Sequence, residues 1–100
     1  MKVKTDKNLY NSGAGNMVGK LTYIDAARDI TNYGNLIADD YLQVSAVRNI
    51  YNYKNMYTEG NAIINAQSVT NSGSNAVLGG VKGLELNAGK VSGSGTIVGI

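Results

Sequence analysis

The sequence repeats about every twenty residues, and this period constrains the fold more than any other feature. Five segments share a phrase of an apolar residue, a polar or aromatic residue, Asn or a small residue, and then a corner: Leu9–Gly13, Ile30–Gly34, Ile50–Lys54, Val69–Gly73 and Val91–Gly95. Their first residues are separated by 21, 20, 19 and 22 positions. Such a period is typical of a solenoid, in which each repeat forms one turn and stacked turns share a core.

The apolar residues of each repeat recur mainly at every second position. The last part of the repeat shows this best, because an apolar residue is followed two positions later by Ala at four equivalent sites: Ile24, Val44, Ile64 and Leu86. Successive side chains of a strand point to opposite faces, whereas a helix needs apolar residues three and four positions apart. The sequence therefore predicts an all-β chain.

Each repeat is predicted to contain three short strands joined by tight corners rich in Asn and Gly. Three strands in about twenty residues cannot fold back as hairpins, so each strand should pair in parallel with its counterpart one turn away. Parallel crossovers favour right-handed winding. The prediction is a right-handed parallel β-helix of four to five turns. It forms one segment over residues 1–100, with turns near 6–27, 28–46, 47–66, 67–88 and a partial turn at 89–100.

The predicted core is a set of rows that run along the coil, one residue from each turn. Strand one contributes Leu9, Ile30, Ile50, Val69 and Val91, and strand two contributes Met17, Leu36, Met56, Val77 and Ile97. A row of small residues should allow close approach of the backbone beside strand two: Gly19, Ala38, Thr58, Gly79 and Gly99. Four equivalent asparagines are predicted to form a structural ladder of stacked amides: Asn11, Asn32, Asn52 and Asn71.

Composition argues against several classes of function. The chain has no Cys and no His, which excludes disulfides and thiolate metal sites and removes the usual nucleophile–base pairs. A net charge of +2 is too small to indicate nucleic-acid binding. The adjacent carboxylates Asp39 and Asp40 are expected to form a solvated corner. We therefore expect no enzyme activity, no metal, no cofactor and no membrane insertion.

The pattern begins and stops inside a repeat. Met1, Val3 and Thr5 match the last strand of a turn, and the sequence stops just after the second strand of its final turn. Uncapped solenoid ends leave unpaired backbone groups and an open apolar cross-section. We therefore expect an excerpt of a longer array, whose partners are neighbouring turns of the same polypeptide and whose isolated form associates end to end. No segment resembles a signal peptide.

One side of the predicted coil carries tyrosines and arginines. Tyr33 and Tyr53 are equivalent in consecutive turns and should stack, and Tyr51 lies on the same outward face. Arg28 and Arg48 fall in another row, two residues before strand one. Aromatic rings pack on sugar rings and guanidinium groups bind anions, so this stripe is a candidate contact for a host-cell glycan or surface protein. The alternative is that the tyrosines only stabilise the sheet.

The repeat resembles those of filamentous haemagglutinin-type exoproteins. The resemblance is carried by Ile30–Ala38 with Leu42–Ala46 and by Val69–Gly73 with Leu84–Gly89, in the pattern apolar-x-Asn-x-Gly followed by Leu-x-Val-x-Ala or Leu-x-Leu-x-Ala. It implies a secreted rod segment at the bacterial surface, exported by two-partner secretion, that mediates attachment and contributes to virulence. The resemblance equally implies, as an alternative, the stalk of a contact-dependent growth inhibition toxin. A carbohydrate-active β-helix enzyme fragment is a weaker alternative from the fold alone.

Overall fold

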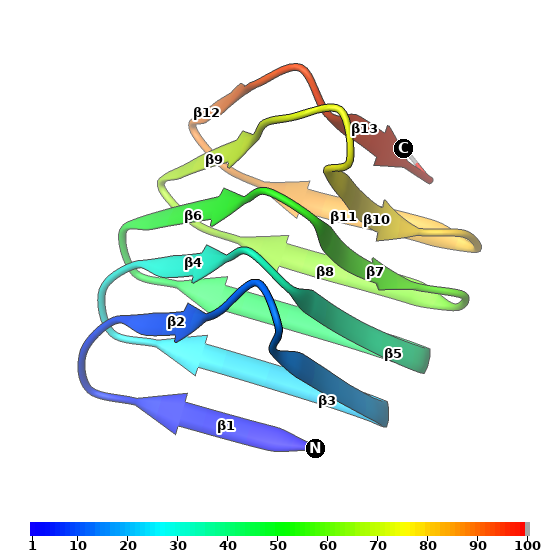
Figure 1. Cartoon of the computed structure of the whole chain (residues 1–100), viewed down its shortest axis with the longest axis horizontal. Helices are drawn as coiled ribbons and strands as arrows, with labels where there is room; N and C mark the ends of the chain where they lie inside the picture. Colours follow the sequence, from blue (N-terminus) through cyan, green and yellow to red (C-terminus); the bar gives the residue numbers. More distant parts are fainter. Residues whose placement is uncertain (100) are drawn as a thin grey trace.

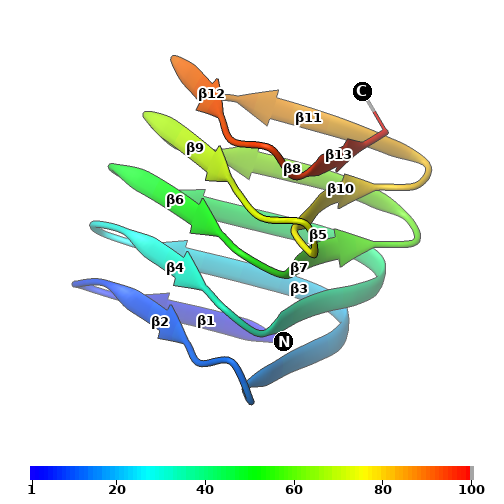
Figure 2. The same cartoon turned by 45° about the horizontal axis from the view of Figure 1, so that its top comes forward.

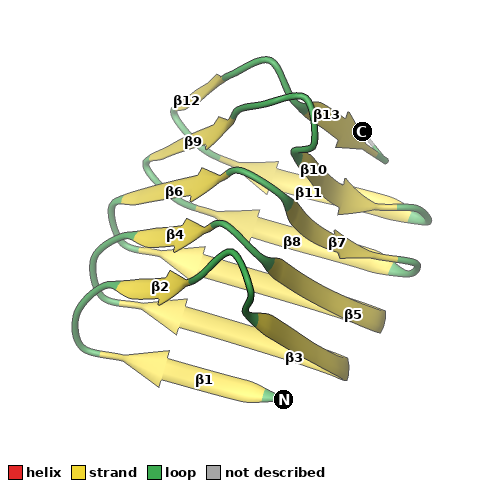
Figure 3. Cartoon of the chain, viewed as in Figure 1, coloured by secondary structure: helices red, strands yellow, loops and turns green. Residues whose placement is uncertain are grey.

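The chain coils upward through thirteen β-strands, and the computed structural model describes residues 1–99 (Figure 1). Ile100, the last residue of the predicted partial turn, lies outside the described residues. Within residues 1–99 there are strands and corners but no helix (Figure 3). The strands are β1 (Lys2–Thr5), β2 (Leu9–Asn11), β3 (Asn16–Ala26), β4 (Ile30–Asn32), β5 (Asn35–Ala46), β6 (Asn49–Asn52), β7 (Asn55–Thr58), β8 (Asn61–Asn65), β9 (Ser68–Asn71), β10 (Val77–Gly80), β11 (Gly83–Asn87), β12 (Lys90–Ser92) and β13 (Thr96–Val98).

Every strand pair is parallel and joins residues about one turn apart. The strand-one row runs β2-β4-β6-β9-β12, and its register places Ile30 on Ile50 and Ile50 on Val69. The other rows form a second sheet along β1-β3-β5-β7-β10-β13, with β8 paired to β5 and β11 paired to β8. The two views of the coil show it winding right-handed through about five turns (Figures 1 and 2). The predicted parallel β-helix is therefore confirmed.

The prediction of three separate strands in every turn was wrong for two turns. Strands two and three run together as the eleven-residue β3 and the twelve-residue β5, whereas the next turn divides them into β7 and β8. A register shift between Gly19 and Leu21 lets β3 bend around the corner without losing its pairing to β5. The third turn instead places Gly60 at the corner, where a Cβ would lie 1.8 Å from the Asp40 carbonyl oxygen.

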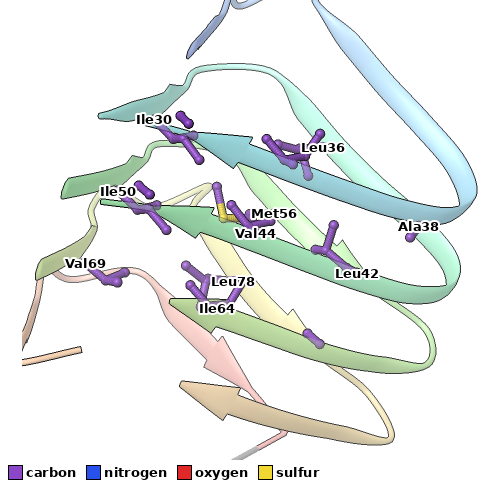
Figure 4. Close-up of a cluster of buried hydrophobic side chains, with 14 residues drawn as sticks. Ile30, Leu36, Ala38, Leu42, Val44, Ile50, Met56, Ile64, Val69 and Leu78 are labelled. Atoms are coloured by element: carbon purple, nitrogen blue, oxygen red, sulfur yellow. The ribbon is translucent and has the colours of Figure 1, made fainter. Parts of the chain in front are cut away.

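Apolar side chains from all three strand positions fill the narrow interior. Ile30, Leu36 and Val44 have no exposed surface, and the same is true of their counterparts one turn further on, Ile50, Met56 and Ile64 (Figure 4). Burying an aliphatic side chain of this size stabilises a fold by about 1.5–3 kcal/mol. The period-two alternation of the sequence thus sends one residue of each pair into the core and the next to the surface.

Strand two of the fourth turn lies one residue out of the predicted register. Leu78, not Val77, pairs with Met56 and is fully buried, while Val77 pairs with Asn55 on the outer face. The small-residue row correspondingly continues through Gly80 rather than Gly79. The cause is the longer corner at residues 72–76, because a one-residue slip moves every strand side chain to the opposite face.

One core position contains a hydroxyl group with no hydrogen-bond partner. Thr22 is fully buried and pairs with Leu42, but its Oγ1 has no partner among the described residues. Thr58 is equally buried, yet its Oγ1 accepts a hydrogen bond of 3.1 Å from the Gly60 N–H. The two residues therefore provide a matched pair, with the same side chain and burial but different hydrogen bonding.

We expect Thr22→Val to raise the free energy of unfolding by about 1 kcal/mol, because it removes an unsatisfied buried hydroxyl and keeps the side-chain shape. Thr58→Val should lower it by about 1 kcal/mol, because the Gly60 N–H loses its acceptor. Urea unfolding monitored by circular dichroism measures both. Equal changes of the same sign in the free energy of unfolding of the two variants would contradict the different hydrogen bonding of Thr22 and Thr58.

Candidate functional site

The four asparagines of the predicted ladder lie over one another inside the corner after strand one. The Nδ2 of each of the first three donates to the Oδ1 of the next asparagine along the chain, at 2.9 Å from Asn11 to Asn32, 2.9 Å from Asn32 to Asn52 and 2.8 Å from Asn52 to Asn71. All four side chains are at least nine-tenths buried. This inner ladder forms a continuous chain of side-chain hydrogen bonds through four turns.

The second amide hydrogen of each ladder residue serves the backbone of the following turn. Asn11, Asn32, Asn52 and Asn71 donate in this way to the carbonyl oxygens of Asn35, Asn55, Val77 and Thr96, at distances from 2.7 to 3.1 Å. The ladder ends where the fifth turn has Gly93 at the equivalent position. Gly93 has φ +108°, and a Cβ there would lie 2.2 Å from the Asn71 carbonyl oxygen. No side chain fits at this end.

A second row of asparagines was not predicted from the sequence. Asn55 Nδ2 donates to Asn35 Oδ1 and Asn35 Nδ2 donates to Asn16 Oδ1, both at 2.8 Å, on the outer face of strand two. The donors of this outer ladder point toward the N-terminal turn, opposite to those of the inner ladder. The equivalent spacing of Asn35 and Asn55 after strand one was the available signal.

A third row uses side-chain oxygens to accept backbone N–H groups at the start of strand one. Asn8 Oδ1 accepts from the Asp29 N–H, and Asp29 Oδ1 accepts from the Asn49 N–H, each at 3.0 Å. Asp29 also lies 3.7 Å from the guanidinium of Arg48, whose side chain is half exposed. An ion pair this exposed contributes little stability, at most about 1 kcal/mol. Asp29 therefore has a local structural role.

The tyrosines Tyr10, Tyr33 and Tyr53 form a column along three consecutive turns. The rings of Tyr33 and Tyr53 stack with centroids 4.6 Å apart and planes 10° from parallel. Tyr10 packs against Tyr33 from the preceding turn, at 5.7 Å and 52°. Aromatic pairs at these separations are favourable by about 0.5–1.5 kcal/mol beyond their buried area. The column therefore ties three turns together on the outside of the coil.

The other residues of the predicted stripe lie away from this column. Tyr51 is in the middle of strand one, paired with Thr31 and Thr70, and has no aromatic neighbour among the described residues. Arg28 and Arg48 are joined by a backbone hydrogen bond of 3.1 Å at the opposite end of strand one. Within residues 1–99 neither arginine stacks on a tyrosine ring. The structure brings together Tyr33 and Tyr53, adds Tyr10, and separates Tyr51 and both arginines from them.

The geometry of the column limits how it could contact a ligand. One face of the Tyr33 ring stacks on Tyr53, and the ring of Tyr10 lies next to Tyr33 at a tilt of 52°. Tyr33 is 43 % exposed, so part of its side chain stays accessible to a ligand. A sugar ring packs on an aromatic face rather than on its edge. The stack of Tyr33 and Tyr53 thus stabilises the sheet and occupies one face of each ring that could otherwise pack on a sugar.

A shallow depression lies on the outer face of β1, β3 and β5, and Tyr23, one member of a second tyrosine pair, lines it. Tyr23 and Tyr41 lie 5.6 Å apart, and the ammonium of Lys2 lies over the Tyr23 ring at 5.7 Å from its centroid. The depression has a volume of about 260 Å³ and is lined mainly by Lys2, Lys4, Tyr23, Asp25, Gln43 and Ser45. Burial, and then the neighbouring Tyr23 and Glu85, raise the pKa of Tyr41.

The acidic residues do not gather into a metal site. Within residues 1–99 no group of three or more Asp or Glu side chains is placed to hold a metal ion. At the corner with Asp39, Asp40 lies 3.8 Å from the Lys20 ammonium, and both side chains are largely exposed. In that same part of the chain no helix has the length and apolarity needed to cross a membrane.

Comparison of the chain with protein-family models, with curated proteins and with solved structures gave no match.

The inner ladder can be tested against the outer one. Asn52→Leu keeps a similar volume but removes the donor to Asn71 and Val77 and the acceptor of Asn32, so we expect a loss of about 2–4 kcal/mol in the free energy of unfolding. Asn55→Leu alters only a partly exposed hydrogen bond and should cost less than about 1 kcal/mol.

Chemical denaturation of the two variants beside the parent chain measures this difference. If Asn52→Leu proved no more destabilising than Asn55→Leu, the inner ladder would not stabilise the fold more than the outer ladder does.

Proposed function

We propose that the chain is a structural rod segment of a secreted bacterial surface adhesin of the filamentous haemagglutinin type, which holds adhesive elements away from the cell. The observation that carries this proposal is the repetition of the same internal contacts in successive turns. The core rows and the inner ladder use equivalent residues from turn to turn. A coil built this way can be lengthened by adding turns without changing any existing contact.

The outer surface agrees with a spacer that binds weakly along its side. The described residues form a shallow depression and a column of packed tyrosines, neither of which encloses a ligand. Contact with a host-cell glycan or surface protein would therefore be spread along the rod, through exposed hydroxyl groups and the cations of Arg28 and Arg48.

The same architecture supports a second candidate, the stalk of a contact-dependent growth inhibition toxin. In that case the rod only sets the reach of a toxic domain. A third candidate is a fragment of a carbohydrate-active β-helix enzyme. Its cleft would require longer corners and clustered carboxylates in turns outside residues 1–99. The internal contacts of the coil are common to all three.

Sequencing the gene and its flanks separates these candidates. The adhesin proposal expects further twenty-residue repeats and a domain for two-partner secretion in the same reading frame. A toxin-like C-terminal domain beside an immunity gene would favour the stalk. Flanking turns with long loops and clustered Asp or Glu would favour the enzyme, and a reading frame with none of these would overturn the rod proposal.

Binding along the rod has its own test. Beads coated with the chain should adhere weakly to epithelial cells, and Arg28→Ala with Arg48→Ala should reduce adhesion several-fold, because these cations lie on the exposed corner. Tyr51→Ala tests the one tyrosine of the predicted stripe that lies outside the column. If adhesion is unchanged in all of these variants, the surface formed by Arg28, Arg48 and Tyr51 does not bind cells.

A further inference from the structure

We propose that the tyrosine column is a site of oxidative cross-linking, in which Tyr33 and Tyr53 are joined as dityrosine by a one-electron oxidant. The pair meets the two requirements of this chemistry, which are close rings and access from solvent. The ring centroids are 4.6 Å apart and the planes are nearly parallel. Tyr33 is exposed and Tyr53 is half-buried.

Backbone hydrogen bonds between turns hold the two tyrosines in neighbouring positions. Tyr33 donates its backbone N–H to the Asn11 carbonyl and Tyr53 donates its own to the Asn32 carbonyl, at 2.9 and 2.8 Å. The neighbouring inner ladder fixes the same corner in both turns. Reacting groups held in this way react as if at a very high local concentration. Coupling within one chain should therefore be faster than coupling between chains in dilute solution.

The coupling needs one oxidising equivalent for each of the two phenols. Each phenol loses one electron and its hydroxyl proton to give a phenoxyl radical, whose spin is shared with the ring carbons ortho to the oxygen. The two radicals form one carbon–carbon bond between ortho carbons, and each ring then transfers its ortho hydrogen back to the oxygen. Two tyrosines have lost two hydrogen atoms. One hydrogen peroxide, turned over by a peroxidase, accepts them and becomes two molecules of water.

The two rings must move out of the stacked arrangement before they can couple, and their position on the surface permits this movement. Stacked rings must tilt about their Cβ–Cγ bonds before two ortho carbons reach bonding distance, and Tyr33 can do so because its side chain is not enclosed by the protein. Tyr10 lies on the other side of Tyr33, so it can pass an oxidising equivalent into the pair. The product would be a covalent staple between adjacent turns on the outside of the coil.

The other tyrosines of the chain provide internal controls. Tyr51 lies two residues from Tyr53 but is flanked by Thr31 and Thr70. Tyr23 and Tyr41 form a tilted pair at 5.6 Å, and the Tyr41 hydroxyl donates to Gln43 at 3.0 Å. Tyr57 donates its hydroxyl to Glu59 at 3.2 Å. Cross-linking at Tyr33 and Tyr53 should therefore exceed that at any other pair.

The experiment treats the dilute chain with a peroxidase and limiting hydrogen peroxide. Dityrosine fluorescence is followed, the monomeric product is isolated under denaturing conditions, and its tryptic peptides are analysed by mass spectrometry. We expect peptide 29–48 joined to peptide 49–54 with the loss of two hydrogens, and fragment ions that place the bond between Tyr33 and Tyr53. Tyr33→Phe and Tyr53→Phe keep the stacked ring but remove the phenol, so each should lower the initial yield about tenfold or more.

Tyr51→Phe should leave the yield unchanged. The isolated product should unfold at a Tm about 5–10 °C higher, because the staple closes a loop of one turn. The proposal is overturned if Tyr51→Phe lowers the yield as much as Tyr53→Phe, if the bond maps mainly to Tyr23 and Tyr41, or if only chains joined to one another are found. Circular dichroism of each variant before treatment verifies that the fold is retained.

Discussion

The structure depends on the stacking of equivalent residues at the spacing of parallel strands, about 4.8 Å per turn. In a coil this narrow the backbone turns sharply between strands. Without side-chain partners, carbonyl groups at these corners would face an apolar interior. Buried polar groups of this kind are costly unless they are hydrogen-bonded. The inner ladder meets this need in four turns, because Asn11, Asn32 and Asn52 each donate to the next asparagine and to a carbonyl oxygen, and Asn71 donates to the Thr96 carbonyl oxygen. The apolar rows can then close around it without an orphaned group at that corner.

The fold followed from the sequence because the same side chains recur at fixed positions in each turn. Ile24, Val44 and Ile64 could be aligned by eye, and the structure stacks them in one register. The repeat length alone could not show which corners contain additional residues. The longer corner before β10 moved Leu78 into the core and Val77 out of it. Nor could the period show that β3 continues through its corner as one strand, since the pairing to β5, with its register shift between Gly19 and Leu21, decides this.

The candidate site was less accessible to sequence reasoning than the fold. The equivalence of Tyr33 and Tyr53 is visible in the repeat, but the approach of Tyr10 crosses the register and depends on its side-chain rotamer. Arg28 and Arg48 share a row with each other, yet strand one separates that row from the tyrosine column. The outer ladder was missed because asparagine occurs at many corners, and only the direction of each amide distinguishes a ladder from a solvated row. Inside the coil the contacts repeat, whereas outside they vary, so what differs between turns lies on the surface.

The central claim is best tested by nuclear magnetic resonance of the side-chain amides in the isotopically labelled chain. We predict that the Asn32 and Asn52 amide protons exchange slowly with solvent and show contacts to the asparagine one turn away, together with backbone contacts between residues 19 to 22 positions apart in parallel order. Rapid exchange at both amides, or backbone contacts that join strands in antiparallel order, would contradict the stacked coil.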